Sequence, residues 1–361
     1  MKKLVLAAVV AALSGQAMAV NVYNADDATL DVYGEIRTRI KKVEGEAGKF
    51  DGDSTKIGVK GKYGIGNDMY VVGEMRMGGD FNNTKDSDNG GEFNFDRGYV
   101  GIGHNAYGVV RAGRMPSVHD TLFSHDESYV WGGSAKNGSN AFGTDVANSA
   151  GQYEWSNESF KVMAQVQGHT SDDATFKKSD KDETLIGSTN IKNGYALGGV
   201  WMSDLGLDIT TAYTSVELDD KNSTLNVFDG GEANSFGVQA KYSINSLTLT
   251  AAVYNFEQTA KKKTDFDREI NSYGLSARYA FANGIGLYGV YDNKETTDNQ
   301  PKVNNKKLEE TSKTFTMGVD FWPHKQFVTY AEFAQEKTEN NKVDSKDKEI
   351  GKYAVGARFY F

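Results

Sequence analysis

The chain ends with the stretch "IGKYAVGARFYF", residues 350–361, which alternates between two kinds of side chain. One set of alternate positions is small or hydrophobic and finishes with two phenylalanines, whereas the other set contains Lys352 and Arg358. Because successive side chains of a strand point to opposite faces, this pattern predicts a strand with one apolar and one largely polar face. Chain ends usually fray, so a strand that runs to Phe361 needs a neighbouring strand to hold it.

The same alternation occurs near the start of the chain, in "LDVYGEIRTRI", residues 30–40. One face carries Leu30, Val32, Gly34, Ile36, Thr38 and Ile40, and the other carries Asp31, Tyr33, Glu35, Arg37 and Arg39. Similar stretches include "DMYVVGEMRMGG", "LTLTAAVYNFEQ" and "QFVTYAEFAQEKT". A heavily charged face does not suit a strand buried in a core. It suits a strand of a membrane barrel, which faces lipid on one side and a polar interior on the other.

The connections between these stretches alternate between short and long. Short ones fall at 64–67, 104–108, 157–159, 203–206, 245–246, 282–284 and 323–325, and long polar ones at 42–54, 79–93, 115–148, 169–190, 219–234, 260–271, 294–312 and 338–349. This rhythm predicts an all-β fold, a transmembrane antiparallel β-barrel of 16 strands with both chain ends on the short-turn side. A barrel of this size encloses an aqueous channel. The alternative, a soluble β-sandwich or solenoid, does not explain two classes of connection.

The N-terminus and the composition agree with export to a membrane. Residues 1–19 read as a signal peptide, with Lys2 and Lys3 before a short apolar run and with Ala17 and Ala19 at an A-x-A cleavage site, so residues 20–361 form the predicted barrel. The formal net charge is −9, which argues against nucleic acid as a partner. The chain has no cysteine, so disulfides and thiolate metal sites are excluded. The mean hydropathy of −0.55 fits strands on which only alternate residues are apolar.

The connection at 115–148 is the longest and contains the apolar residues Leu122, Phe123 and Trp131. We expect this long third external loop to fold into the lumen, pack those residues against the wall and turn its carboxylates towards the channel. The carboxylates are those of Asp120, Asp126 and Glu127. A solvated external loop with an aromatic cluster is the alternative.

The sequence resembles the general diffusion porins of Gram-negative bacteria. The resemblance rests on "DVYGEI", "STKIGVKGKYG", "RGYVGIG", the "GR" at 113–114 and the terminal "ARFYF". It implies a homotrimer of sixteen-stranded barrels in the bacterial outer membrane, surrounded by lipid and lipopolysaccharide. It also implies that the barrel-assembly machinery reads the C-terminal strand ending at Phe361, and that the third loop forms an eyelet opposite a ladder of basic residues.

The basic ladder is carried over onto this chain position by position. Lys56 stands where these porins place a wall arginine, and Arg114 is the arginine of the "GR" step. The second basic position falls on Arg97 or on its neighbour Asp96, because the spacing to "VGI" is one residue short. Arg37 and Arg39 add positive charge on the first strand, where Glu35 replaces a lysine of some relatives. The alternative is that these are ordinary lumen charges with no special role.

The expected function is passive passage of ions and small hydrophilic solutes, with a mild preference for cations from the loop carboxylates. No enzyme activity, cofactor or metal is expected. His119 and His125 lie next to Asp120 and Asp126, but we interpret them as solvated loop residues. The glycine-rich stretches "GKYGIG" (61–66) and "GIGHNAYG" (101–108) imitate the spacing of phosphate-binding loops, but they lie at hairpin turns with no following helix. A substrate-specific channel is an alternative, although no clear run of lumen aromatics stands out. A non-channel surface adhesin or antigen is another.

Overall fold

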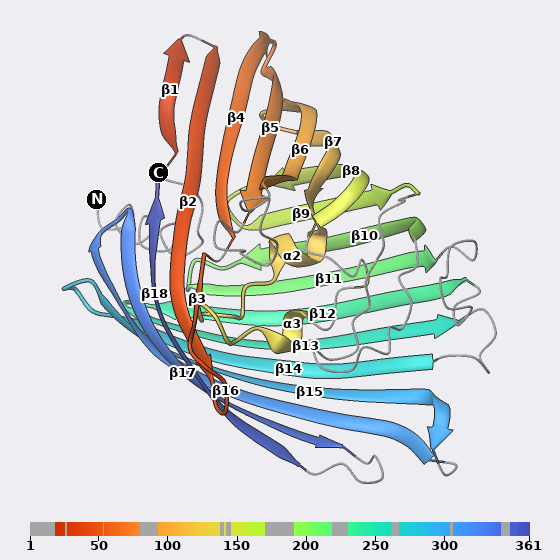
Figure 1. Ribbon diagram of the computed structural model, residues 1–361. Helices are drawn as coiled ribbons and strands as arrows, with labels where there is room; N and C mark the ends of the chain where they lie inside the picture. Colours follow the sequence, from red (N-terminus) through yellow and green to blue (C-terminus); the bar gives the residue numbers. More distant parts are fainter. Residues whose placement is uncertain are drawn as a thin grey trace, which may run out of the picture.

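The strands form one closed antiparallel barrel, seen in Figure 1. The computed structural model describes residues 19–25, 27–52, 54–79, 93–137, 141, 146–169, 191–218, 230–260, 267–303, 306–340 and 347–361. Within these residues, sixteen long strands pair with their neighbours in chain order, and the last also pairs with the first. The predicted fold class and strand number are therefore confirmed. Residues 1–18, which hold most of the predicted signal peptide, lie outside the described residues.

The sixteen long strands are β2 (Ala28–Val43), β4 (Thr55–Gly66), β5 (Met69–Gly79), β6 (Phe93–His104), β7 (Gly108–Pro116), β8 (Val146–Ser156), β9 (Phe160–Gln167), β10 (Ile191–Met202), β11 (Leu207–Leu218), β12 (Gly231–Ile244), β13 (Leu247–Ala260), β14 (Asp267–Ala280), β15 (Ile285–Val303), β16 (Lys306–His324), β17 (Phe327–Asn340) and β18 (Lys348–Tyr360). Two short strands, β1 (Val20–Ala25) and β3 (Lys49–Asp51), pair with β2. Both short strands were absent from the sequence prediction.

The short turns lie within three residues of the predicted positions, with the first at 67–68 where 64–67 was predicted. At the first of them, Asn67 and Asp68 adopt left-handed φ values of 51° and 60°, which suit the right-handed twist of a tight hairpin. The connection predicted at 294–312 is wrong in its extent, because β15 and β16 continue as a paired ladder as far as Val303 and Lys306. This stretch is rich in polar and charged residues. The alternation of apolar and polar side chains is therefore weaker here than in the parts of β15 and β16 that lie nearer the short turns.

The outer face of the barrel is apolar, as the alternation predicts. Val100, Val166 and Val355 are each about two-thirds exposed, while their sequence neighbours on the inner face are more covered. On the terminal strand, Tyr353 and Phe359 point outwards, whereas Lys352 and Arg358 contact residues inside the barrel. No α-helix in the described part of the chain has the length and apolar character to span a bilayer.

The barrel closes at Gly34 and Phe361. The backbone N–H of Gly34 donates to the Phe361 carbonyl at 2.8 Å, and the Phe361 N–H donates to the Gly34 carbonyl at 3.0 Å. Two backbone hydrogen bonds to β2 thus hold the terminal residue, so the last strand is ordered as far as Phe361. A Cβ on Gly34 would lie 2.6 Å from Cζ of Phe361 and 2.5 Å from the Lys56 carbonyl oxygen. Only glycine lets the last ring and the neighbouring backbone approach this closely.

We therefore predict that Gly34→Ala destabilises the barrel, whereas Gly289→Ala does not. The Gly34 substitution forces an overpacked contact that typically costs about 1–3 kcal/mol. A Cβ on Gly289 would meet its nearest atom, the Thr316 carbonyl oxygen, at an ordinary 3.8 Å. Thermal unfolding of the two variants in detergent, followed by circular dichroism, measures the difference. Equal unfolding temperatures would show that the packing of Phe361 on Gly34 does not support closure.

Candidate functional site: the internal segment and the charged wall

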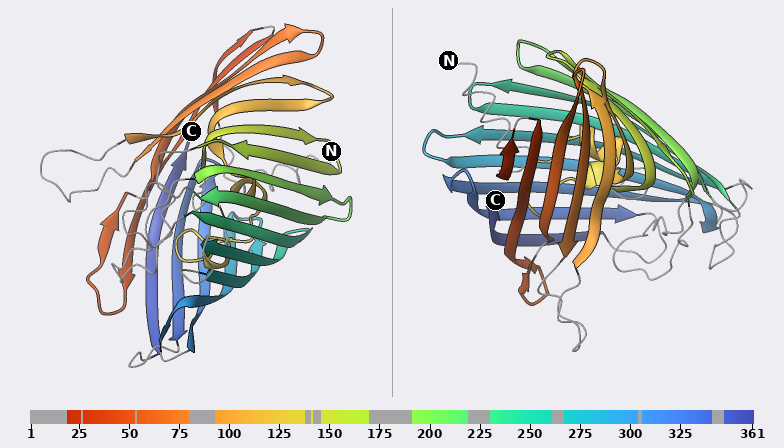
Figure 2. Two further views of the ribbon diagram at one scale, coloured as in Figure 1. Left: turned by 90° about the vertical axis from the view of Figure 1, so that its right-hand side faces the viewer. Right: turned by 90° about the horizontal axis from the view of Figure 1, so that it is seen from above.

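Residues 117–137, which follow β7, run inside the ring of strands, where Figures 1 and 2 place two short helices. These are α2 (Val118–Leu122) and α3 (Ser134–Asn137). Ser117 starts α2 by accepting a hydrogen bond from the Asp120 N–H at 3.1 Å, the usual role of serine at a helix N-cap. We refer to residues 117–137 as the internal segment.

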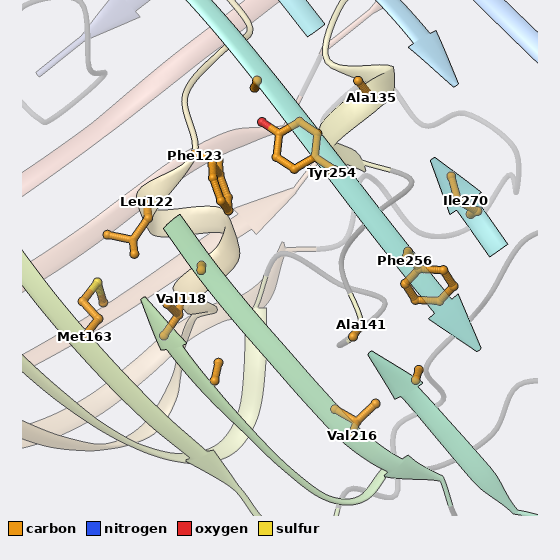
Figure 3. Packing of buried hydrophobic residues seen from close by; sticks show 14 of the residues in the cluster. Val118, Leu122, Phe123, Ala135, Ala141, Met163, Val216, Tyr254, Phe256 and Ile270 are labelled. Carbon is orange, nitrogen blue, oxygen red and sulfur yellow. The ribbon is translucent and has the colours of Figure 1, made fainter. Parts of the chain in front are cut away.

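A hydrophobic cluster attaches the start of the internal segment to the barrel wall (Figure 3). Val118, Leu122 and Phe123 are buried there. Their partners on the strands include Met163, Ala196, Ala212, Val216, Ala233, Ala252, Tyr254, Phe256 and Ile270. Two glycines leave room for the segment, since a Cβ on Gly198 would lie 2.6 Å from Leu122 and a Cβ on Gly237 would lie 2.6 Å from Phe123. The inner face of β9–β14 is therefore partly apolar. Removing this surface and the apolar side chains of the segment from water favours the attachment of the segment to the wall.

A buried hydrogen-bonded group holds the middle of the segment. His125 is fully buried, with Nδ1 at 2.8 Å from the Tyr254 hydroxyl and Nε2 at 2.9 Å from an Asp292 carboxylate oxygen. The other Asp292 oxygen accepts the backbone N–H of Ser134 at 3.1 Å. One wall carboxylate thus fixes two points of the segment. The expectation that His125 is a solvated loop residue is wrong, because its partners lie on strands far away in sequence.

His119 is also buried, which corrects the same expectation for the second histidine. Its ring lies 4.9 Å from the Phe123 ring and 5.7 Å from the Tyr254 ring. Burial, together with the nearby charge of Lys136, lowers the pKa of His119 to about 3. His119 is therefore neutral near pH 7 and acts as a packing residue, so it adds no positive charge to the interior.

The far part of the segment is attached to β15–β18. The Tyr129 hydroxyl donates to Asp320 at 2.9 Å, its backbone N–H donates to Glu332, and its ring stacks on Tyr330 at 4.3 Å. Arg358 donates to the Tyr129 carbonyl at 2.8 Å. The contacts of the internal segment therefore run from the β9 side of the barrel round to β18.

The inner wall that continues from β18 through β2, β4, β5 and β6 to β7 carries a row of basic residues. In strand order these are Arg358, then Arg37 and Arg39, then Lys56, Arg76, Arg97 and Arg114. Carboxylates lie between them. Glu35 lies 2.7 Å from Arg37 and 3.6 Å from Lys56, Glu74 lies 3.7 Å from Arg97, and Asp96 pairs with Arg76.

A β-bulge explains the short spacing at Arg97. Arg76 faces Arg97 across the ladder but the next residue, Met77, faces Phe95, so Asp96 is the extra residue. Phe95 and Val100 both point outwards although they are five positions apart, which strict alternation forbids. Because of the bulge, Asp96 and Arg97 both reach ion-pair partners on β5. The sequence analysis assigned the second position of the basic ladder to either Arg97 or Asp96, and both side chains lie on the inner wall.

The predicted loop acids Asp120 and Asp126 occupy different environments. The Asp120 carboxylate lies 2.8 Å from Lys136 Nζ, so a base of the same segment neutralises it. The Asp126 carboxylate accepts a hydrogen bond from the Ser128 N–H at 2.8 Å and lies against Gly132 and Gly133. It therefore stabilises the conformation of the segment. Burial raises the pKa of Asp126 and that of Glu127.

The predicted acids and bases are not in direct contact. Among the described residues, none of Asp120, Asp126 and Glu127 forms an ion pair with Lys56, Arg97 or Arg114. Arg114 instead donates to the Asp96 carbonyl at 3.1 Å and to Asn148. The two sets lie on separate surfaces, the bases on the wall and the acids on the segment.

The sequence analysis missed two of the basic residues and the inner aromatics. Arg76 shares the inner face of β5 with Glu74, and Arg358 shares that of β18 with Lys352, so alternation alone had indicated their direction. The inner aromatic side chains of the segment and of β15–β18 include Tyr129, Trp131, Tyr288, Trp322, Tyr330 and Tyr360. They come from one loop and four separate strands, which is why no run of aromatics was visible in the sequence.

A model of the Gram-negative porin family matches residues 6–341. The chain belongs to this family. Similar proteins include outer membrane protein F of Serratia marcescens, 26% identical over 361 residues and 92% of each chain. Another is a monosaccharide porin of a Halomonas species, 26% identical over 311 residues, which cover 81% of this chain and 79% of that one.

Solved structures share the fold. The anion-selective porin of Comamonas acidovorans superposes with a TM-score of 0.71 at 15% identity, over 93% of this chain and all of the other. The trimer form of OmpT of Vibrio cholerae superposes with a TM-score of 0.68 at 17% identity over the same shares. Family and fold together make this chain a multi-pass barrel of the bacterial outer membrane and a general diffusion channel.

Proposed function

We propose that solutes cross this channel through a waist between the internal segment and the basic wall of β18–β7. The attachment of the segment to the other side of the barrel supports this proposal most strongly. His125, Tyr129 and Phe123 tie the segment to β12–β17, so the remaining passage borders the charged wall. The constriction residues are then Lys56, Arg97, Arg114, Arg37, Arg39, Asp120, Asp126 and Glu127, with Arg76 and Arg358 added.

Transport through this waist requires no bond chemistry, so we propose that the protein is not an enzyme. Fixed charges on a narrow wet passage order water and attract ions and dipolar solutes. Apolar solutes disturb that ordered water and pass slowly. The permeating solutes are therefore ions and small hydrophilic molecules, without a bound cofactor or metal.

The ion preference of the waist should be weak. The mild cation preference expected from the sequence relied on three carboxylates, but Lys136 neutralises Asp120 and the backbone of the segment engages Asp126. The wall bases are likewise interleaved with Glu35, Glu74 and Asp96. The fields of paired opposite charges largely cancel at longer range, and salt screens what is left beyond the Debye length, roughly 8 Å at physiological salt.

A substrate-specific channel is the second candidate, because two half-buried aromatic side chains, those of Trp322 and Tyr360, lie on the inner wall. Tyr129 packs against both Tyr288 and Tyr330, and these two wall tyrosines are almost fully buried. Buried rings support the segment and offer no free face to a solute. The Halomonas relative named as a monosaccharide porin makes sugars the natural test solutes for this candidate.

We predict that the double variant Asp120→Asn/Glu127→Gln shifts the reversal potential towards anions under a salt gradient. Both carboxylates belong to the internal segment, where confinement reduces screening by solvent. The matched control Glu232→Gln/Glu257→Gln also removes two acids, but from exposed positions on β12 and β13. The control should shift the reversal potential by less than half as much. Equal shifts would place the internal segment away from the conduction path.

The proposed assembly is a homotrimer in contact with outer-membrane lipid and lipopolysaccharide. The outer face of β1–β7 contains an apolar groove of about 790 Å³, lined by Leu30, Gly61, Gly73, Val100, Ala112 and their neighbours. Small residues let two surfaces approach closely within a membrane, so a second copy is the occupant we propose. Gly34 is covered by Phe361 and is not among the residues that line this groove.

The chain ends support the proposed processing and assembly steps. Val20 pairs with Val32 on β2, and Phe361 pairs with Gly34, two residues further along the same strand. Cleavage after Ala19 would therefore place the new amino group close to the terminal carboxylate. The outward Phe359 and Phe361 at this end are the side chains we propose the barrel-assembly machinery reads.

Native mass spectrometry of the purified protein tests processing and assembly in one measurement. We predict three protomers in each particle, and a protomer mass equal to that of residues 20–361. A protomer that begins elsewhere would contradict the cleavage site. A particle with any other number of protomers would contradict the trimer.

A further inference from the structure

Two arginines face each other directly at the junction of β18 and β2. Arg358 and Arg37 are cross-strand partners, and both point into the barrel. Like charges in directly opposite positions destabilise a sheet. One carboxylate, Glu35, serves both Arg37 and Lys56, at 2.7 Å and 3.6 Å. Three basic side chains, those of Arg358, Arg37 and Lys56, therefore lie on this part of the wall, and two of them face each other at a stability cost.

An aromatic pair lies next to these arginines, on the side nearer the short turns. Tyr360 follows Arg358 by two residues on the same face of β18, a separation of roughly 7 Å along a strand. The Trp322 ring lies parallel to the Tyr360 ring, with 5.9 Å between centroids and 10° between planes. Both side chains are half-buried, in contrast to the almost fully buried Tyr288 and Tyr330.

The donor groups of this surface are incompletely used. Nε1 of Trp322 and Nε of Arg37 are buried and have no hydrogen-bond partner among the described residues. Arg358 lies 4.7 Å from the Tyr129 ring and donates to the Tyr129 carbonyl, which fixes its position beside the internal segment. Fixed guanidinium groups bind carboxylates through charge-assisted, often bidentate hydrogen bonds.

We propose that Arg37, Arg358, Trp322 and Tyr360 form a binding site for a small carboxylate carried on a flat ring. The carboxylate would lie between the two arginines and relieve their repulsion, while the ring would stack against Trp322 and Tyr360. The proposal rests on the proposed passage along the basic wall, because solutes reach the site only by that route. An uncharged ring lacks the arginine contacts, and an acyclic carboxylate lacks the stacking.

Block of single-channel KCl current in planar bilayers tests this site. The probes are benzoate, acetate, which has no ring, and benzyl alcohol, which has no charge. For the unaltered protein we expect benzoate to reach half-block at a concentration at least tenfold below that of acetate, and benzyl alcohol to have no effect. Trp322→Leu should raise the benzoate concentration for half-block about five- to tenfold and leave acetate unchanged. Arg37→Gln should weaken the block by both carboxylates.

Trp201→Leu is the matched control, because Trp201 is a 43% exposed tryptophan of β10 on the outer face. This variant should behave like the unaltered protein with all three probes. Equal block by benzoate and acetate would overturn the site, as would equal effects of the two tryptophan substitutions. An unaltered protein that conducts no KCl would overturn the proposed passage together with the site, whereas normal conductance without ring selectivity would overturn the site alone.

Discussion

The hydrogen-bond ladder between β18 and β2 is the constraint on which the rest of the molecule depends. In a bilayer an unpaired backbone N–H or carbonyl costs several kcal/mol, so a sheet can span it only as a closed ring. The two bonds between Gly34 and Phe361 complete that ring at the last residue of the chain. Closure also sets the charges of the interior, since it brings Arg358 opposite Arg37 and Gly356 opposite Arg39.

A closed ring of sixteen strands leaves an interior too wide to fill with side chains alone. The internal segment occupies part of that space and divides the wall into two regions. From β9 to β17 the wall carries the alanines, the buried Tyr254 and the Asp292 carboxylate that hold the segment. From β18 to β7 it keeps its charged residues. The interior is therefore asymmetric, because one part of the wall binds the internal segment and the other part carries the row of basic and acidic side chains.

The strands were predictable because lipid on one side and water on the other impose alternation on every residue. The contacts of the segment were not, because they join residues far apart in sequence. His125 reads as a polar loop residue, and its partners Tyr254 and Asp292 lie 129 and 167 positions away. Alternation likewise indicated that Arg358 points inwards, but it does not fix which residue of β2 stands opposite. The bulge at Asp96 had a sequence signal, the odd spacing between Phe95 and Val100.

The most direct test of this account asks whether the internal segment rests on the wall during conduction. The chain has no cysteine, so the pair Leu122→Cys/Ala212→Cys provides a single possible disulfide, between α2 and β11. Leu122→Cys/Leu197→Cys is the control, since Leu197 faces outwards. We predict that oxidation cross-links the first pair only, and that the cross-linked pore keeps the single-channel conductance of its reduced form. Absence of the cross-link, or a severalfold change in conductance when it forms, would contradict the account.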